Sequence, residues 1–182
     1  MAELRTERLI LRRWREEDRE PFARMNRDPA VMEFFPALLS REESDALIDR
    51  IETRFVDCGF GLSAVELRES GEFVGFIGLS APPFQAAFTP CVEIGWRLAA
   101  QHWGKGLATE GARAVVDYAF GTLKLPEVVS FTSTGNLRSR HVMEKISMAR
   151  DPAEDFDHPL LPEGHALQRH VLYRLKNHVS RT

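Results

Sequence analysis

The stretch Gln101-His102-Trp103-Gly104-Lys105-Gly106-Leu107-Ala108 follows a segment of alternating apolar residues, 92–98, and opens an apolar-periodic segment, 107–120. This order predicts a strand, a tight glycine turn and a helix. The first amides of a helix lack intrahelical partners and lie at the positive end of its dipole. Two glycines at the turn let a phosphate approach the backbone without meeting a Cβ atom. We interpret the stretch as an anion-binding turn for a phosphorylated cofactor; a turn that binds nothing is the alternative.

Apolar periodicity outward from this turn predicts the remaining elements. A capping-box pattern, Ser40-x-x-Glu43, marks the start of one helix, and Asn136 marks the start of another. The expected helices cover 16–27, 40–58, 107–120 and the segment after Asn136, with a short helical turn at Asp28-Pro29. The expected strands cover 9–14, 61–67, 73–79, 92–98, 128–132, 148–156 and 167–175. A hairpin set followed by strand, helix and strand predicts a mixed sheet with helices on both faces, an α/β domain.

The strand before the glycine turn has two unlike faces, because side chains alternate along a strand. One face carries Val92, Ile94, Trp96 and Leu98, and the other carries Glu93, Gly95 and Arg97. A crowded apolar group at 31–35 predicts core, or the wall of a substrate cleft.

Composition limits the classes of protein that this chain can belong to. The 182 residues carry a net charge of −3 and are 43% hydrophobic, which favours one domain spanning 1–182 and no nucleic-acid partner. The basic run 12–15 is expected to be solvated surface. No apolar run reaches the ~18 residues of a membrane helix and the charged N-terminus is no signal peptide, so we expect a soluble cytoplasmic protein.

The two cysteines, Cys58 and Cys91, have no metal-ligand or redox spacing. We expect both to be reduced, buried thiols, and we expect no metal site.

Two nucleotide-binding motifs are also absent. The glycine turn lacks the third small residue of a dinucleotide fingerprint, and Gly104-Lys105 is followed by Gly106 rather than by the Ser or Thr of a P-loop.

Several further motifs accompany the turn. They are Thr6-Glu7-Arg8-Leu9-Ile10-Leu11-Arg12, Asp28-Pro29-x-Val31-Met32, Val92-Glu93-Ile94-Gly95-Trp96, Gln101-x-x-Gly104-x-Gly106 and Asn136-x-x-Ser139-x-x-Val142-Met143-Glu144-Lys145. With them, nearly the whole chain resembles the Gcn5-related N-acetyltransferases (GNAT), and more closely their ribosomal-protein alanine N-acetyltransferase branch of the RimJ/RimL type. The resemblance implies a single-domain fold with a mostly antiparallel sheet of about seven strands.

The resemblance also implies the co-substrate, acetyl-CoA. Its pyrophosphate is expected on the backbone amides of 103–108, and its pantetheine arm along the strand 92–98 where that strand splays from the next. The implied cofactor-binding residues are Ile94, Trp96, Leu98, Gln101, Trp103, Gly104, Lys105, Gly106, Leu107, Ala108, Asn136, Ser139 and Arg140. For Asn136 a plain helix cap is the alternative interpretation.

The implied reaction is direct transfer of the acetyl group to a primary amine. Neutralising an α-amine at pH 7 costs only ~1 kcal/mol, whereas a lysine amine costs ~4–5 kcal/mol, so the demand on a base depends on the acceptor. Glu93 is the candidate base; an ion pair with Arg97 is its alternative role. His158 and His170 are further candidates if the last hairpin borders the cleft. Asp155 and Asp157 would recognise a cationic substrate or face solvent.

The residue that assists the leaving thiolate departs from the wider family. Many members have a tyrosine where this chain has Met143, and the two tyrosines here, Tyr118 and Tyr173, lie elsewhere in the pattern. The alanine-acetyltransferase branch uses a serine one turn earlier, which Ser139 matches. A second departure is Ser147, at a position where glycine is usual, and it leaves the geometry of the helix exit open.

The acceptor has no readable motif. Family members diversify at segments corresponding to 28–60 and 153–167, so protein and peptide N-termini and small-molecule amines all stay open. Dimers are common in the family, and a homodimer is possible here. A non-catalytic acyl-CoA-binding or regulatory module of the same fold is the alternative to an enzyme, but the presence of both Glu93 and Ser139 favours an enzyme.

Overall fold

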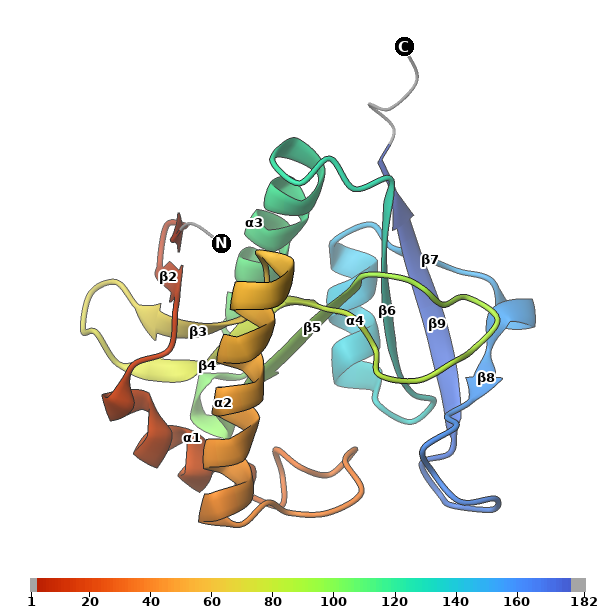
Figure 1. Ribbon diagram of the computed structural model, residues 1–182, viewed down its shortest axis with the longest axis horizontal. Coiled ribbons are helices and arrows are strands. Elements are labelled where there is room, and N and C mark those ends of the chain that lie inside the picture. The colour runs from red at the N-terminus through yellow and green to blue at the C-terminus, as the bar shows by residue number, and fades with distance from the viewer. Residues whose placement is uncertain (1–2, 178–182) are drawn as a thin grey trace.

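A computed structural model describes residues 3–177 and shows a mixed α/β fold with a mostly antiparallel nine-stranded sheet (Figure 1). The strands are β1 (Leu4–Arg5), β2 (Leu9–Arg12), β3 (Leu62–Leu67), β4 (Phe73–Ser80), β5 (Glu93–Leu98), β6 (Glu127–Ser133), β7 (Ala149–Arg150), β8 (Phe156–Asp157) and β9 (Arg169–Lys176). The α-helices are α1 (Arg19–Asn26), α2 (Arg41–Cys58), α3 (Leu107–Gly121) and α4 (Leu137–Lys145). This architecture confirms the predicted fold class.

The sheet consists of two antiparallel halves that meet at one parallel pair of strands. Strands β1 to β5 pair in chain order, and β6 pairs with β9, which also carries β7 and β8. The parallel pair, β5 and β6, matches at a single position, Glu93 opposite Val129. The two halves of the sheet are therefore free to diverge beyond that position.

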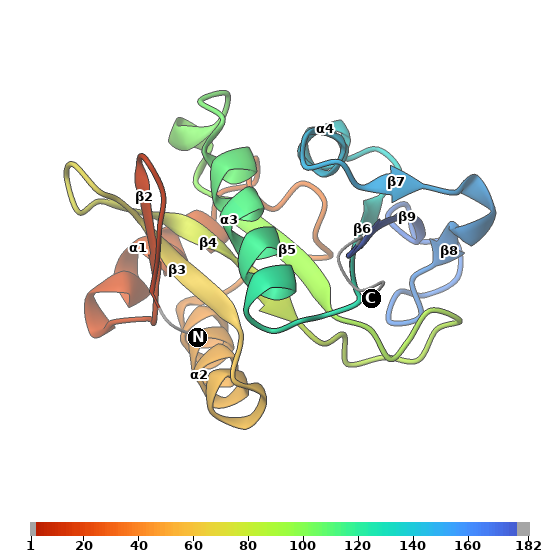
Figure 2. The same ribbon diagram turned by 90° about the horizontal axis from the view of Figure 1, so that it is seen from above.

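Helices cover both faces of the sheet, as the order of elements predicts (Figure 2). Neighbouring residues of a strand enter different cores. Ala64 of β3 and Phe76 of β4 pack with the helices α1 and α2, whereas the next residues, Val65 and Ile77, pack with α3 and α4. The strand alternation of period two thus separates two hydrophobic cores, one on each side of the sheet.

Local sequence signals fix the helix that later borders the site. At the start of α2 the Ser40 hydroxyl accepts from the Glu43 amide at 3.1 Å, and the Glu43 carboxylate accepts from the Ser40 amide at 2.7 Å. This is the predicted capping box. Gly59 ends α2 with φ of +75°, a left-handed conformation that favours glycine.

Four expectations need correction. The expected strand 148–156 is broken by a 3₁₀ turn at Pro152–Glu154 into the short strands β7 and β8. The segment after Asp28 forms turns rather than a helix. Cys58 is free but exposed, because it is the last residue of α2, and Cys91 is free and half-buried.

Arg12 is the fourth correction, because it is buried rather than solvated. Its guanidinium donates to both Asp18 carboxylate oxygens at 2.6 and 2.9 Å, and its Nε donates to Glu66 at 2.6 Å. Two carboxylates compensate the buried charge, which sequence periodicity alone does not reveal.

Within residues 3–177, the helices are all too short or too polar to cross a membrane.

Candidate active site

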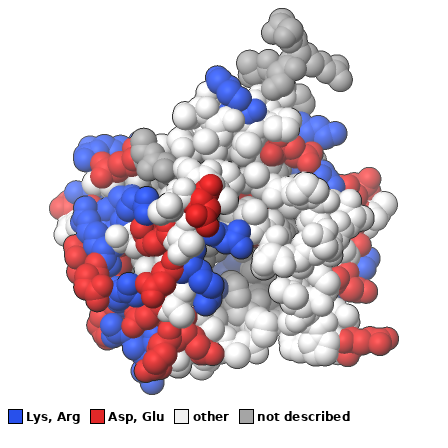
Figure 3. Space-filling view, in the orientation of Figure 1, with Lys and Arg blue, Asp and Glu red and all other residues white. Residues whose placement is uncertain are grey.

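A cavity of about 860 Å³ opens where β5 and β6 diverge. The Val129 amide donates to the Val92 carbonyl at 2.9 Å, and Glu93 opposite Val129 is the last paired position before the strands separate. Residues of β5, the glycine turn, the start of α3, β6 and α4 line the cavity, together with 34–36 and parts of 158–170. The face shown in Figure 3 is hollowed near its middle, between the positions that α2 and α4 take in Figure 1.

The glycine turn forms one end of the cavity. Gly104 and Gly106 have φ of +73° and +79°, and Gly106 is the N-cap residue of α3. A Cβ at Gly104 would meet nothing within 4 Å, and one at Gly106 only the Arg8 side chain at 3.6 Å, so these glycines are required by backbone conformation and not by crowding in the protein. The α3 N-terminus, with its unpaired first-turn amides, therefore borders the cavity.

The N-terminal segment holds this turn in place. The Glu110 carboxylate, in the first turn of α3, accepts from the Thr6 hydroxyl at 2.5 Å, from the Arg8 amide at 2.8 Å and from Arg8 Nε at 2.6 Å. Arg8 Nη1 also donates to the Lys105 carbonyl at 2.9 Å. The Thr6-Glu7-Arg8 motif therefore fixes the backbone at the start of α3, a structural role that its sequence pattern does not disclose.

The predicted cofactor residues divide into two groups. Those that line the cavity are Trp96, Leu98, Trp103, Gly104, Gly106, Leu107, Ala108, Asn136 and Ser139. Those whose side chains lie elsewhere are Ile94, Gln101, Lys105 and Arg140. Ile94 is completely buried in the core against α3, and Gln101 and Lys105 face solvent. Arg140 donates to the Thr134 carbonyl at 3.1 Å, and its side chain is not part of the cavity wall.

Glu93 lies in the cavity wall on β5. Its carboxylate accepts a hydrogen bond from the Ser80 hydroxyl at 3.2 Å, across the β4–β5 pair. Burial raises the pKa of Glu93 to about 7, although the Ser80 hydrogen bond acts in the opposite direction. Arg97 instead donates to Asn26 at 2.6 Å, so the alternative ion pair between Glu93 and Arg97 does not form. Glu93 is thus a carboxylate that titrates near neutral pH in the cleft.

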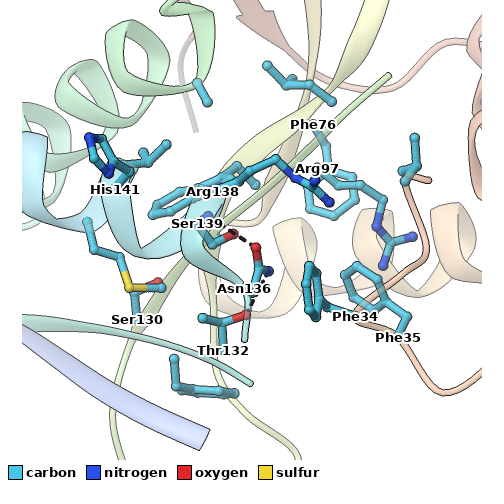
Figure 4. Close-up of a pocket in the computed structure, with 18 of the residues that line it drawn as sticks. Phe34, Phe35, Phe76, Arg97, Ser130, Thr132, Asn136, Arg138, Ser139 and His141 are labelled. Atoms are coloured by element: carbon cyan, nitrogen blue, oxygen red, sulfur yellow. Dashed lines mark hydrogen bonds between the residues drawn. The ribbon is translucent and has the colours of Figure 1, made fainter. Parts of the chain in front are cut away.

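Asn136 and Ser139 form the opposite wall, at the start of α4 (Figure 4). Asn136 Oδ1 accepts from the Ser139 amide at 3.2 Å, and Nδ2 donates to the Thr132 hydroxyl at 2.9 Å. The Asn136 side chain is therefore a helix cap in this structure. Its two amide atoms are used within the protein, whereas the Ser139 hydroxyl has no hydrogen-bond partner among residues 3–177 and borders the cavity.

No tyrosine lines the cavity in the described part of the chain. Met143 lines it but is almost completely buried, and the Tyr173 hydroxyl donates to Glu144 at 3.1 Å. Ser147 adopts φ of +66°, as a glycine would, and the Met148 amide donates to the Met143 carbonyl at 3.0 Å. The exit of α4 thus keeps a Schellman-type end despite the serine.

The two candidate histidines belong to an aromatic cluster at the far side of the cavity. The rings of His158 and His170 lie 4.9 Å apart, and Phe131 packs against both, at 6.1 and 6.2 Å. Burial lowers the pKa of both imidazoles, so they are uncharged at neutral pH. Asp155 pairs with Arg150 and Asp157 with Arg169, and neither aspartate lines the cavity.

Four further lining residues are predictable from the sequence only in part or not at all. Phe34 and Phe35 belong to the apolar group that predicts core or a cleft wall, and the cleft wall is correct for both. Arg97 and Arg138 are ordinary arginines in the sequence, yet both line the cavity and stack on aromatic rings, Arg97 on Phe35 at 3.9 Å and Arg138 on Trp103 at 4.5 Å. Nothing local distinguishes them, because their neighbours are brought together only by the fold.

The family of the chain follows from comparison with known proteins. Residues 8–149 match the family model described as an acetyltransferase (GNAT) domain. This match covers both walls of the cavity up to β7. The chain therefore belongs to the GNAT acetyltransferase family, which confirms the family resemblance.

Individual relatives support this assignment. The uncharacterized protein YkkB of Bacillus subtilis is 31% identical over 81% of this chain and 85% of its own length. The FsC-acetyl coenzyme A-N(2)-transacetylase of Aspergillus fumigatus is 37% identical over 77% of this chain, and the match spans 62% of that protein. An acetyltransferase from Agrobacterium tumefaciens superposes with a TM-score of 0.79 at 30% identity, covering 96% of this chain and 94% of its own.

More distant structures share the fold alone. They include a spermidine N-acetyltransferase from Vibrio cholerae in complex with CoA and spermine, with a TM-score of 0.73 and 18% identity over 94% of this chain and 97% of its own. Among residues 3–177, no group of three or more His, Cys, Asp or Glu side chains is arranged to hold a metal ion.

Proposed function

We propose that the protein transfers the acetyl group of acetyl-CoA directly to a primary amine, with Glu93 as the base and Ser139 as the donor to the leaving sulfur. One observation carries the proposal. A single cavity connects the glycine turn to Glu93 on one strand and Ser139 on the opposite helix. In this proposal a ligand held by its phosphates at the turn extends along the cavity towards both groups.

The residues present fit acetyl-CoA. The two left-handed glycines leave the α3 N-terminus open to a pyrophosphate, since a Cβ is absent at the points of closest approach. Trp96 and Leu98 supply an apolar wall for a pantetheine arm, and Arg138 lies near the turn, stacked on Trp103. When bound, acetyl-CoA supplies an acetyl group activated as a thioester.

Each catalytic group has a defined task. Glu93 accepts a proton from the attacking amine, directly or through one water. Because its pKa is about 7, a large fraction of Glu93 is ionised and can act as a base at neutral pH. The unpaired Ser139 hydroxyl donates a hydrogen bond to the sulfur as negative charge develops there. Both groups are on rigid elements, β5 and α4, which fixes their separation.

Replacing Ser139 with Ala is expected to lower kcat about 10- to 100-fold while acetyl-CoA affinity stays within about twofold. A hydrogen bond to a charged group is worth ~1.5–3 kcal/mol, and this one forms only as the sulfur becomes charged. The measurement is steady-state turnover together with calorimetric binding of acetyl-CoA. Ser70→Ala, in the exposed β3–β4 turn, is the control. An unaltered kcat in Ser139→Ala would remove Ser139 from the mechanism.

The proposed activity is tested by incubating the purified protein with acetyl-CoA and separate panels of peptide N-termini, amino acids, polyamines and other small amines. We expect thiol release that depends on the amine, and a product heavier by one acetyl group in mass spectrometry. Saturable acetyl-CoA binding with no transfer to any amine would instead indicate a non-catalytic acyl-CoA-binding module of the same fold.

A further inference from the structure

Arg97 is a half-buried cation in the wall of the cavity, and the proposed reaction does not use it. It lies on β5, on the same face as Glu93, and its side chain extends toward α1 and the segment 34–36. Figure 4 shows Arg97, Phe34 and Phe35 on one side of the view and Thr132, Asn136 and Ser139 on the other. Arg97 therefore borders the part of the cavity that faces away from the α4 wall.

The guanidinium of Arg97 contacts a polar side chain on one side and aromatic rings on the other, and none of these neighbours is charged. Nη1 donates to Asn26 Oδ1 at 2.6 Å, and Asn26 is itself held by the Ser44 hydroxyl at 3.1 Å. The guanidinium stacks on Phe35 at 3.9 Å and lies 5.3 Å from the Phe76 ring. Its Nε is buried without a hydrogen-bond partner, and no carboxylate within residues 3–177 forms an ion pair with it.

Arg12, which is buried, shows how this fold compensates the charge of an arginine. Arg12 contacts two carboxylates, Asp18 and Glu66, whereas Arg97 has one amide and two aromatic faces. A buried charge without a counter-ion is costly, and burial lowers the pKa of Arg97 to about 10. The group is still protonated at neutral pH. Its charge is left available to whatever enters the cavity.

The charges lining the cavity indicate the sign of that ligand. Glu93 is the only carboxylate among the described lining residues. Three cations line the cavity, Arg97, Arg138 and Lys145, and of these Arg138 already pairs with Glu33 at 2.5 Å. The other side chains around the part of the cavity that faces away from α4 are aromatic or uncharged. They include Phe34, Phe35 and the neutral imidazoles of His158 and His170. A polyamine would meet one carboxylate there, and that carboxylate is needed as the base.

We propose that the acceptor is a small amine that also carries a carboxylate, an amino acid or short peptide, and that Arg97 binds this carboxylate. The inference rests on the proposed function, since it names the acceptor class for the same site. A guanidinium with unused N–H donors suits a carboxylate, and the stacking on Phe35 holds its plane in one orientation. Asn26 and Ser44 then act as positioning residues behind it.

The test compares acids with their own amides, and each kcat/KM is calculated per unprotonated amine, because amidation of a nearby carboxylate also lowers the pKa of the amine. The acceptors are glycine, 6-aminohexanoate and a dipeptide, each against its amide, with spermidine as a polyamine. We expect kcat/KM to be about 10- to 100-fold higher for at least one acid than for its amide. Comparable rates for each acid and its amide, or a preference for spermidine, would overturn the inference and leave the acetyltransferase proposal standing. Acetylation of no amine would overturn both.

Variants assign the preference to Arg97. In Arg97→Gln we expect kcat/KM for the preferred acid to fall about 10- to 100-fold, the value for its amide to stay within about threefold, and the acetyl-CoA dissociation constant to be unchanged. Arg97→Lys, which keeps the charge, should retain part of the preference and guards against loss through misfolding. Arg24→Gln, on the exposed face of α1, is the matched control. Equal losses for acid and amide, or weaker acetyl-CoA binding, would show that Arg97 does not recognise the acceptor's carboxylate.

Discussion

Replacing Gly104 and Gly106 together with Val is expected to weaken acetyl-CoA binding by about 100-fold or more. Each position has φ above +70°, which a β-branched residue adopts only with strain, so the turn must rearrange. Rearrangement turns the α3 amides away from the pyrophosphate, and each amide facing a charged acceptor contributes ~1.5–3 kcal/mol. The measurement is calorimetric titration with acetyl-CoA.

A matched control separates this effect from general destabilisation. Gly59 and Gly71 have φ of +75° and +72°, and a Cβ at either position would meet nothing within 4 Å, as at Gly104. They lie at the end of α2 and in the β3–β4 turn, outside the cavity wall. We expect the double Val variant at 59 and 71 to lose thermal stability but to bind acetyl-CoA normally. If the 104/106 variant also kept wild-type affinity, the turn would not be the pyrophosphate site.

The parts of the site that the sequence predicts are those determined by local pattern. A strand, a glycine turn and a helix follow one another within 30 residues, and each signal is readable from its own neighbours: alternation at 92–98, glycines at 104 and 106, and period 3.6 after 107. The Asn136 cap is local for the same reason. Glu93 and Ser139 themselves are implied by the family resemblance. Alternation assigns only the strand face of Glu93, and the helix start assigns only the turn on which Ser139 lies.

The parts that sequence could not predict depend on partners far apart in the chain. Arg12 and Arg97 look alike as sequence, yet the fold gives one two carboxylates and the other none. Ile94, Trp96 and Leu98 share one face of β5, yet only Trp96 and Leu98 line the cavity, because the core against α3 covers Ile94. The resemblance implies the strand along which the cofactor lies, but only the packed sheet shows which side chains of that strand line the cavity.

The same reasoning explains why the acceptor is the least predictable part of the site. The acceptor side is built from segments without regular periodicity, 31–36 and 158–170, which contribute Phe34, Phe35 and the imidazoles. Turns and short strands tolerate many sequences, so no local rule assigns their side chains to a cavity. The proposed acceptor class therefore rests on the charge balance of the wall, which is a property of the assembled site.

Replacing Glu93 with Gln is expected to lower kcat/KM about 100-fold at pH 8 and to remove a pH dependence centred near 7. Wild-type activity should rise as pH increases through about 7, because only ionised Glu93 accepts the amine's proton. The loss should be smaller for an α-amine than for a more basic amine, since neutralising the α-amine costs only ~1 kcal/mol at pH 7. The measurement is kcat/KM for the acceptor from pH 5.5 to 9 at saturating acetyl-CoA. Glu69→Gln, an exposed carboxylate in the β3–β4 turn, is the control.

Stability provides an independent readout of the same carboxylate. Burial raises the pKa of Glu93 from its ordinary value of 4.5 to about 7, so the folded protein binds the proton more tightly than the unfolded chain. Ionisation of Glu93 therefore lowers the free energy of unfolding. This destabilisation is absent below pH 4.5, grows between pH 4.5 and about 7, and is complete above about pH 7. We expect Glu93→Gln to be more stable than wild type at pH 8, by on the order of 1–3 kcal/mol, and equally stable at pH 4.5. Equal stability at both pH values, with the activity inflection near pH 7 retained in the variant, would assign that inflection to another group.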